Sequence, residues 1–195
     1  MKPYFDTSHA AGALLLIAVL CWTMIEISHL DNSRQEATKV GGAGRWFAAW
    51  PFLIAASAVL YLAPPLVPAA AIRPAAAVFA IGFVILLAGL ALRGWSIKTL
   101  GAYFTASVKV SADQPMITAG PYRVLRHPSY TGLLLIMAGI GLASANWAGA
   151  AGVAVVTLAG LLWRIHAEER ALLATLGDPY RAYAAQHKRL VPLVW

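Results

Sequence analysis

The chain has 195 residues, of which 60% are hydrophobic and 12% charged, and its formal net charge is +7. Soluble domains are about 45–50% apolar and about 25% charged, so this composition excludes an ordinary soluble globular enzyme. A chain this short cannot bury so much Leu, Ala and Val in one core, and the mean hydropathy of +0.69 indicates a lipid bilayer as the solvent for much of its surface. The single cysteine, Cys21, excludes a disulfide framework.

Five apolar runs approach the length of about 17–25 residues that a helix needs to cross a hydrocarbon core about 30 Å thick. In chain order they are residues 9–28, 46–66, 74–92, 129–144 and 147–165. Only Asn146 and its neighbours separate the last two runs, which predicts a tight antiparallel helical hairpin. The expected fold is an all-α integral membrane protein with five transmembrane helices.

The basic residues orient these spans. With the N-terminus outside, the cytoplasmic segments hold 13 of the 15 Lys and Arg residues, and only Lys2 and Arg73 lie outside, in agreement with the positive-inside rule. An odd number of spans then puts the loop after the third span and the C-terminal tail on the same cytoplasmic side. The positive charge follows from this topology, so no nucleic-acid partner is expected.

The segment 93–128 breaks the apolar pattern and is too long for a simple connection between two membrane helices. It includes an alternating stretch at residues 107–110 and ends at Pro128, which suits the first turn of the helix that follows. His127 and Tyr130 are therefore expected at the cytoplasmic mouth of the fourth span. Backbone donors at such a helix start face an incoming anionic ligand.

A second polar element begins at the cytoplasmic end of the fifth span. Arg164 and Glu168 are four residues apart there, so both lie on one face of a helix. Because the fourth and fifth spans form a hairpin, this pair is expected to converge with His127 and Tyr130 on one interfacial pocket. The tail at 176–192 is expected to break, continue as a helix and cap that pocket.

A set of ordered motifs in the C-terminal half, from about Leu100 to Pro192, carries a family resemblance. The motif residues are Tyr122-Arg123, Arg126-His127-Pro128-Ser129-Tyr130, Gly132, Arg164, Glu168-Glu169, Gly177-Asp178, Tyr180, Tyr183 and Arg189-Leu190-Val191-Pro192. Together they resemble the isoprenylcysteine carboxyl methyltransferase family, and phospholipid N-methyltransferases share the general pattern. The resemblance implies a membrane enzyme that binds S-adenosylmethionine in a cytosolic pocket and takes a lipid-like acceptor from the bilayer. It divides the chain into three N-terminal membrane helices, residues 1–92, and a catalytic region, residues 93–195, with a cytosolic C-terminal helical cofactor-binding region.

The resemblance also implies roles for individual residues. The cofactor site would be lined by Met116, Ile117, Tyr122, His127, Pro128, Ser129, Tyr130 and Glu168. Arg164 would face the methyl acceptor, and Arg164 and Glu168 together are the expected catalytic pair; no metal site is expected. Tyr122 and Tyr130 would face the sulfonium, each contributing about 0.5–2 kcal/mol as a cation–π contact. Glu168 would accept hydrogen bonds from the cofactor's ammonium or ribose hydroxyls, and His127 would donate to its carboxylate.

Several alternatives stay open at this stage. The acceptor is a prenylated cysteine carboxylate, a free isoprenoid acid or a lipid amine, and the oligomeric state is undetermined. The function is alternatively that of an NADPH-dependent membrane sterol or lipid reductase, because sterol reductases resemble the same C-terminal region, or that of a small transporter or scaffold. Arg123 and Arg126 are alternatively anchors for lipid headgroups. Glu26, near the end of the first span, is expected to form a hydrogen bond between helices.

Overall fold

The computed structural model describes residues 2–39, 50–104 and 115–192, without the side chains of residues 28–39, 50 and 102. In these ranges the regular structure is helical, with two isolated β-bridges. The α-helices are α1 (Tyr4–Thr7), α2 (His9–Lys39), α3 (Trp50–Leu66), α4 (Ala75–Leu100), α5 (Pro128–Ala143), α6 (Trp147–Leu176) and α7 (Asp178–Gln186). The 3-10 turns are η2 (Pro68–Ala70), η3 (Gly101–Tyr103) and η4 (Gly120–Arg123). The alternating stretch predicted at 107–110 and the first residues of the second predicted span, 46–49, lie outside the described residues.

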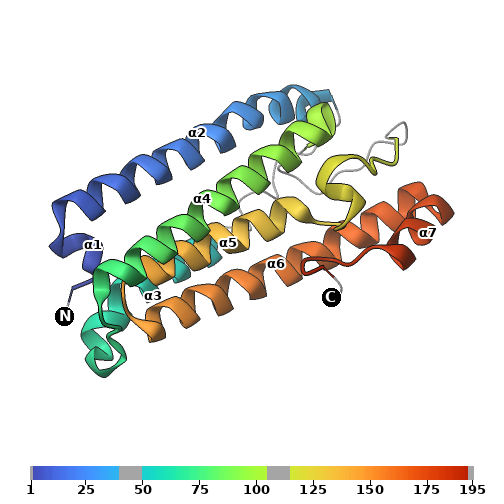
Figure 1. The fold of residues 1–195 in the computed structure, drawn as a ribbon. Helices are drawn as coiled ribbons and strands as arrows, with labels where there is room; N and C mark the ends of the chain where they lie inside the picture. Colours follow the sequence, from blue (N-terminus) through green and yellow to red (C-terminus); the bar gives the residue numbers. More distant parts are fainter. Residues whose placement is uncertain (1, 40–49, 105–114, 193–195) are drawn as a thin grey trace.

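Three helices in the described ranges are long and apolar enough to cross a membrane. They are His9–Ile27 within α2, the whole of α4 and the whole of α6. Two shorter apolar helices, Pro51–Leu66 and Pro128–Ala143, accompany them. Over the described ranges, the predicted all-α fold is therefore confirmed with three candidate membrane spans, and the long helices run side by side along one direction (Figure 1).

The third predicted span ends later than the sequence indicated. Instead of stopping at residue 92, α4 continues to Leu100, so the predicted boundary between Leu92 and Arg93 lies inside a helix. Arg93 continues the helix because its guanidinium is not left in an apolar environment alone: it pairs with Glu26 and donates to Ser129. A charge that is paired in this way is tolerated within a membrane helix.

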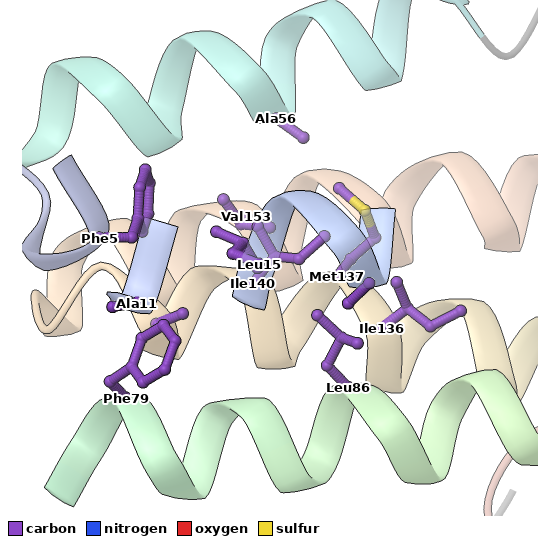
Figure 2. Close-up of a cluster of buried hydrophobic side chains, with 12 residues drawn as sticks. Phe5, Ala11, Leu15, Ala56, Phe79, Leu86, Ile136, Met137, Ile140 and Val153 are labelled. Carbon is purple, nitrogen blue, oxygen red and sulfur yellow. The ribbon is translucent and has the colours of Figure 1, made fainter. Parts of the chain in front are cut away.

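Glycines bring α4 and α5 close together. A Cβ added at Gly82 would lie 2.7 Å from the carbonyl oxygen of Gly139, and one added at Gly89 would lie 2.7 Å from that of Gly132. Small residues at such an interface let two backbones approach, which is how helices gain packing energy in lipid. Around this contact, Figure 2 shows a buried cluster drawn from several helices, with Phe5, Leu15, Leu86, Ile136, Met137, Ile140 and Val153 among its members.

The predicted hairpin between the last two apolar runs is confirmed. Asn146 caps α6, because its side-chain oxygen accepts a hydrogen bond from the Gly149 amide at 2.9 Å. The Asn146 amide group also donates to the Val67 carbonyl at 3.1 Å, which ties the turn to the end of α3. Since the turn is short, the start of α5 faces the second half of α6. The η4 turn and α7 lie at the end of the bundle where α5 begins, away from the Asn146 turn (Figure 1).

Candidate active site

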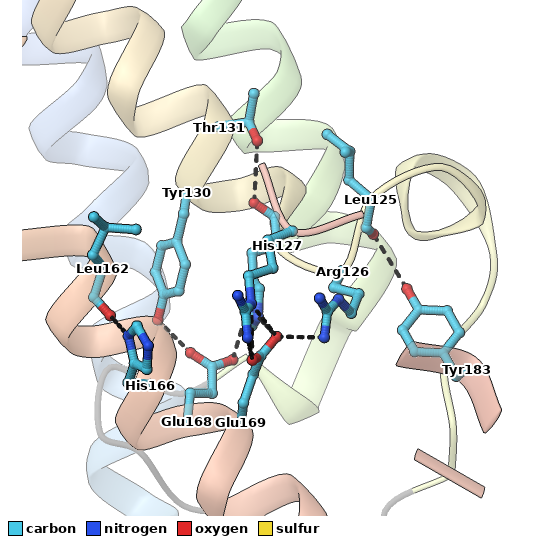
Figure 3. Close-up of polar contacts among 11 residues, drawn as sticks. Leu125, Arg126, His127, Tyr130, Thr131, Leu162, His166, Glu168, Glu169 and Tyr183 are labelled. Carbon is cyan, nitrogen blue, oxygen red and sulfur yellow. Dashed lines mark hydrogen bonds and ion pairs between the residues drawn. The ribbon is translucent and has the colours of Figure 1, made fainter. Parts of the chain in front are cut away.

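The Tyr130 hydroxyl lies at the centre of the candidate site. It donates to Glu168 Oε2 at 2.5 Å and accepts from Arg164 Nε at 2.7 Å. Arg164 and Glu168 are one turn apart on α6, as their spacing predicted, so one hydroxyl on α5 bridges the two. The Arg164 guanidinium also lies 5.8 Å from the centre of the Tyr130 ring. Figure 3 shows the Tyr130 hydroxyl directed at Glu168.

His127 lies beside this bridge, at the N-terminal end of α5. Its side chain is buried, and its ring stacks on that of Tyr130 with the centroids 5.6 Å apart. Nδ1 lies 3.9 Å from Glu168 Oε1, and Nε2 lies 3.3 Å from Glu169 Oε1. The imidazole is therefore between two carboxylates. The structure thus brings together the four side chains that the sequence predicted to converge.

The second carboxylate, Glu169, was not among the predicted site residues. The whole residue is 7% exposed. Its carboxylate pairs with two arginines in addition to contacting His127. Arg126 Nη1 lies 2.7 Å from Oε1, and Arg189 donates to Oε2 from Nη2 at 2.9 Å and from Nε at 3.0 Å. These cations offset the cost of burying the carboxylate. The alternative that Arg126 anchors a lipid headgroup is wrong in this arrangement, because its side chain is 14% exposed and points at Glu169.

The C-terminal segment forms hydrogen bonds to the short connection between η4 and α5. The predicted break occurs at Gly177, whose φ of +60° suits glycine, and α7 follows as the predicted helix. The backbone after α7 then accepts from the amide of Arg126, through the Lys188 carbonyl at 2.8 Å, and from the amide of His127, through the Arg189 carbonyl at 3.1 Å. The tail is therefore bound to the backbone at the start of α5, and its capping of a pocket there stays a prediction.

Buried tyrosines support the same connection. Tyr183 on α7 donates to the carbonyls of Tyr122 at 2.7 Å and of Leu125 at 3.2 Å. Burial raises the pKa of Tyr183 to about 12, and burial together with the nearby Glu168 carboxylate raises the pKa of Tyr122 above its usual range. Burial likewise raises the pKa of Tyr180. All three phenols are therefore neutral at physiological pH.

The remaining predicted site residues lie around this centre. Pro128 and Ser129 are buried in the first turn of α5, and Ser129 is bound by Arg93 of α4. Met116 and Ile117 are half-buried in the non-helical segment before η4. Neither Arg93 nor Glu169 was assigned to the site from the sequence. The adjacency of Glu169 to Glu168 was the available signal, but only the rotation of α6 shows which carboxylate is buried.

The hydrogen bond between helices predicted for Glu26 is confirmed. Its carboxylate pairs with Arg93 of α4, with Glu26 Oε2 accepting from Nη2 at 2.9 Å, and Oε1 also accepts from Trp22 Nε1 at 2.9 Å. Arg93 Nη1 in turn donates to the Ser129 carbonyl at 3.1 Å and to the Ser129 hydroxyl at 2.9 Å. Through Arg93, helix α2 is thus connected by hydrogen bonds to α5, the helix that carries Tyr130.

Comparisons with known proteins agree with this geometry. Residues 80–174 match the family model described as the isoprenylcysteine carboxyl methyltransferase (ICMT) family. The chain is 33% identical over 115 residues to protein-S-isoprenylcysteine O-methyltransferase B of Arabidopsis thaliana, a match that covers 58% of each protein. It is 30% identical over 122 residues to the protein-S-isoprenylcysteine O-methyltransferase of Schizosaccharomyces pombe, covering 59% of this chain and 49% of that one.

A solved structure shows the same likeness. The eukaryotic intramembrane Ras methyltransferase ICMT, solved without a monobody, superimposes with a TM-score of 0.59 and 26% sequence identity, over 73% of this chain and 51% of that chain. The present chain therefore spans about half to three-fifths of the length of these relatives. The bridge of Tyr130, Arg164 and Glu168 lies within the matched residues, whereas Glu26 and Arg189 lie outside them.

Proposed function

Because its residues 80–174 make this chain a relative of the ICMT family, we propose that it is an S-adenosylmethionine-dependent methyltransferase of the membrane. The reaction would be carboxyl O-methylation of an isoprenylated cysteine or of a similar prenyl or lipid carboxylate. The observation that carries the proposal is the Tyr130 hydroxyl held between Arg164 and Glu168. It joins one cationic and one anionic side chain at the hairpin end where the family's motifs converge.

The residues present fit S-adenosylmethionine. The Glu168 side chain is 31% exposed, so its carboxylate has capacity to accept from an ammonium or from ribose hydroxyls. The neutral rings of Tyr122 and Tyr130 suit a sulfonium. When bound, the cofactor supplies a methyl group on a positively charged sulfur.

The structure changes the role proposed for His127. The resemblance implied that it donates to the cofactor's carboxylate, but its two ring nitrogens face Glu168 and Glu169. Both ring nitrogens are thus already directed at carboxylates of the protein, and neither is left to donate to a carboxylate of the cofactor. We therefore assign to His127 the task of orienting Glu168 and, through the stacked rings, Tyr130. Met116, Ile117, Pro128 and Ser129 remain proposed as the lining of the cofactor site.

Arg164 is the proposed partner of the acceptor. Its planar guanidinium can bind a carboxylate through two parallel hydrogen bonds and fix which oxygen faces the methyl group. That oxygen is already nucleophilic, so no side chain has to remove a proton. The protein's contribution would then be to hold donor and acceptor in line, which can lower a barrier by about 7–11 kcal/mol.

We propose that the membrane topology follows the sequence prediction. Five helices, α2 to α6, would cross the bilayer with the N-terminus outside and the C-terminus and the site on the cytoplasmic side. At 1.5 Å per residue the 16 residues of α5 span roughly 24 Å, so the bilayer would thin around it or its ends would be covered by protein. The catalytic part would then comprise residues 93–195, which include the last two turns of α4.

Binding and turnover of the purified protein test the proposal. In detergent, calorimetry is expected to show micromolar binding of S-adenosylmethionine or of its demethylated product and no binding of NADPH. With a labelled methyl donor, label is expected to transfer to a prenylcysteine in preference to a fatty acid or a phospholipid amine. Saturable NADPH binding without heat from S-adenosylmethionine would instead indicate the reductase. Transfer to the phospholipid amine alone would keep the methyltransferase and overturn the carboxylate acceptor.

A further inference from the structure

A buried ion pair connects the first long helix to the candidate site. Arg93 of α4 is 6% exposed, and its guanidinium holds the Glu26 carboxylate of α2 through Nε and Nη2. The same guanidinium holds Ser129 through Nη1, which donates to both the carbonyl and the hydroxyl. One arginine therefore uses the three nitrogens of its planar fork on two other helices at once.

The position of Arg93 is set by close packing. A Cβ added at Gly132 would lie 2.8 Å from both the backbone nitrogen and the Cβ of Arg93, so α5 lies directly against α4 at this point. The Arg93 guanidinium also lies 5.9 Å from the centre of the Phe104 ring. With its backbone fixed against α5, the direction of the Arg93 fork depends mainly on the anion that it faces, Glu26.

Ser129 connects this ion pair to the chemistry. It lies between His127 and Tyr130 in sequence, in the first turn of α5, and Arg93 binds both its carbonyl and its hydroxyl. Tyr130 is the next residue, so a rotation of this turn would move the Tyr130 hydroxyl away from Arg164 and Glu168. The Glu26 carboxylate also lies within electrostatic range of the Arg164 guanidinium.

We propose that Glu26 is a positioning residue for the methyl-transfer site. It orients Arg93, Arg93 fixes the first turn of α5, and that turn sets the Tyr130 hydroxyl between Arg164 and Glu168. This inference rests on the proposed function. It gives α2, which lies outside the residues matched by the family model, a defined part in the reaction.

A different role would be purely structural, with the ion pair only holding α2 against α4. A double-mutant cycle distinguishes the two, because residues that act through one chain of contacts have non-additive effects. The cycle consists of E26Q, S129A and the double variant, each measured for affinity toward the demethylated cofactor product and for thermal unfolding. The matched control is W22F, which removes the other hydrogen bond to the Glu26 carboxylate and leaves the ion pair in place.

We expect E26Q and S129A each to weaken product binding by about three- to tenfold, the effect of one or two hydrogen bonds. The double variant is expected to bind no more weakly than the weaker single variant, and W22F to bind like the wild type. Additive losses, or wild-type affinity in folded E26Q, would overturn the positioning role. An inactive wild type that binds neither cofactor nor product would instead overturn the proposed function.

A second variant keeps the test decisive if E26Q does not fold. R93K retains a positive charge against Glu26, but a single ammonium cannot reproduce the fork that reaches Glu26 and Ser129 together. It is expected to lose product affinity to a similar extent, with little change in unfolding temperature. Wild-type product affinity in R93K would contradict the inference.

Discussion

Replacing Glu169 by Gln should destabilise the protein far more than the same replacement at its neighbour, Glu168. The Glu169 side chain is 9% exposed, and its carboxylate is paired with Arg126 at 2.7 Å and with Arg189 at 2.9 Å. Removing one member of a buried ion pair costs about 3–5 kcal/mol, because the other member stays buried without its counter-ion. Arg189 is 27% exposed and can turn toward water, so the lower end of that range, about 3 kcal/mol, applies.

Glu168 is the matched control for this prediction. It is the next residue on the same helix and carries the same group, but its side chain is 31% exposed and its hydrogen bond comes from a neutral phenol. For E168Q we expect a loss of free energy of unfolding below about 1 kcal/mol, accompanied by weaker binding of cofactor product.

Unfolding in mixed micelles, followed by tryptophan fluorescence, measures both variants. For E169Q a loss of about 3 kcal/mol corresponds to a change of roughly two orders of magnitude in the unfolding equilibrium constant. The segment after α7 should also become accessible to protease, because Arg189 is part of it. If E169Q and E168Q unfold together at the wild-type midpoint, the cluster around Glu169 does not stabilise the fold and the reasoning from burial fails.

Three further predictions follow from other contacts. R164A should raise the acceptor KM or abolish turnover and, because Arg164 also holds the Tyr130 hydroxyl, weaken cofactor affinity by no more than the three- to tenfold expected for E26Q; a larger loss of cofactor binding in calorimetry would show that Arg164 was misassigned. G89A should lower the free energy of unfolding by about 1–3 kcal/mol, because its Cβ would meet the Gly132 carbonyl oxygen at 2.7 Å, whereas G94A, with nothing within 4 Å, should not. The raised pKa of Tyr183, about 12, predicts stability that is complete below the unfolded-state pKa of about 10 and falls as the pH rises toward 12. Y183F should unfold more easily at neutral pH and show a smaller alkaline loss in the same assay; an unchanged alkaline loss would exclude this phenol as its source.

The central bridge could be predicted from the sequence because it depends on local geometry. The four-residue spacing of Arg164 and Glu168 fixes their common face, and a connection as short as that around Asn146 fixes which end of α5 they meet. Pro128 fixes the start of α5, and with it the positions of His127 and Tyr130. Each of these steps uses only residues that are close in sequence or joined by a short turn. The convergence of the four side chains therefore follows from their spacing, the helix start at Pro128 and the length of the hairpin connection.

Arg93 could not be predicted in the same way. A charged residue at the end of an apolar run normally marks the point where a helix leaves the membrane, and this reading put Arg93 in the cytoplasmic loop. Its actual position depends on Glu26, 67 residues earlier in the chain, and on the close approach of α4 to α5. Long-range pairing therefore decided the end of this helix, against the local composition.

The adjacent carboxylates of Glu168 and Glu169 show the same difference between contacts that local spacing predicts and contacts that depend on distant residues. Consecutive helical residues point in directions about 100° apart, so Glu168 and Glu169 cannot both face the Tyr130 hydroxyl. Sequence spacing selected Glu168 correctly through its relation to Arg164. It gave no information on what Glu169 faces, because Arg126 and Arg189 arrive there from the η4 connection and from the tail beyond α7. The buried Glu169 carboxylate thus holds the tail through Arg189, while the half-exposed Glu168 carboxylate faces the Tyr130 hydroxyl. Two neighbouring residues of identical charge therefore make different contacts because they lie on different sides of one helix.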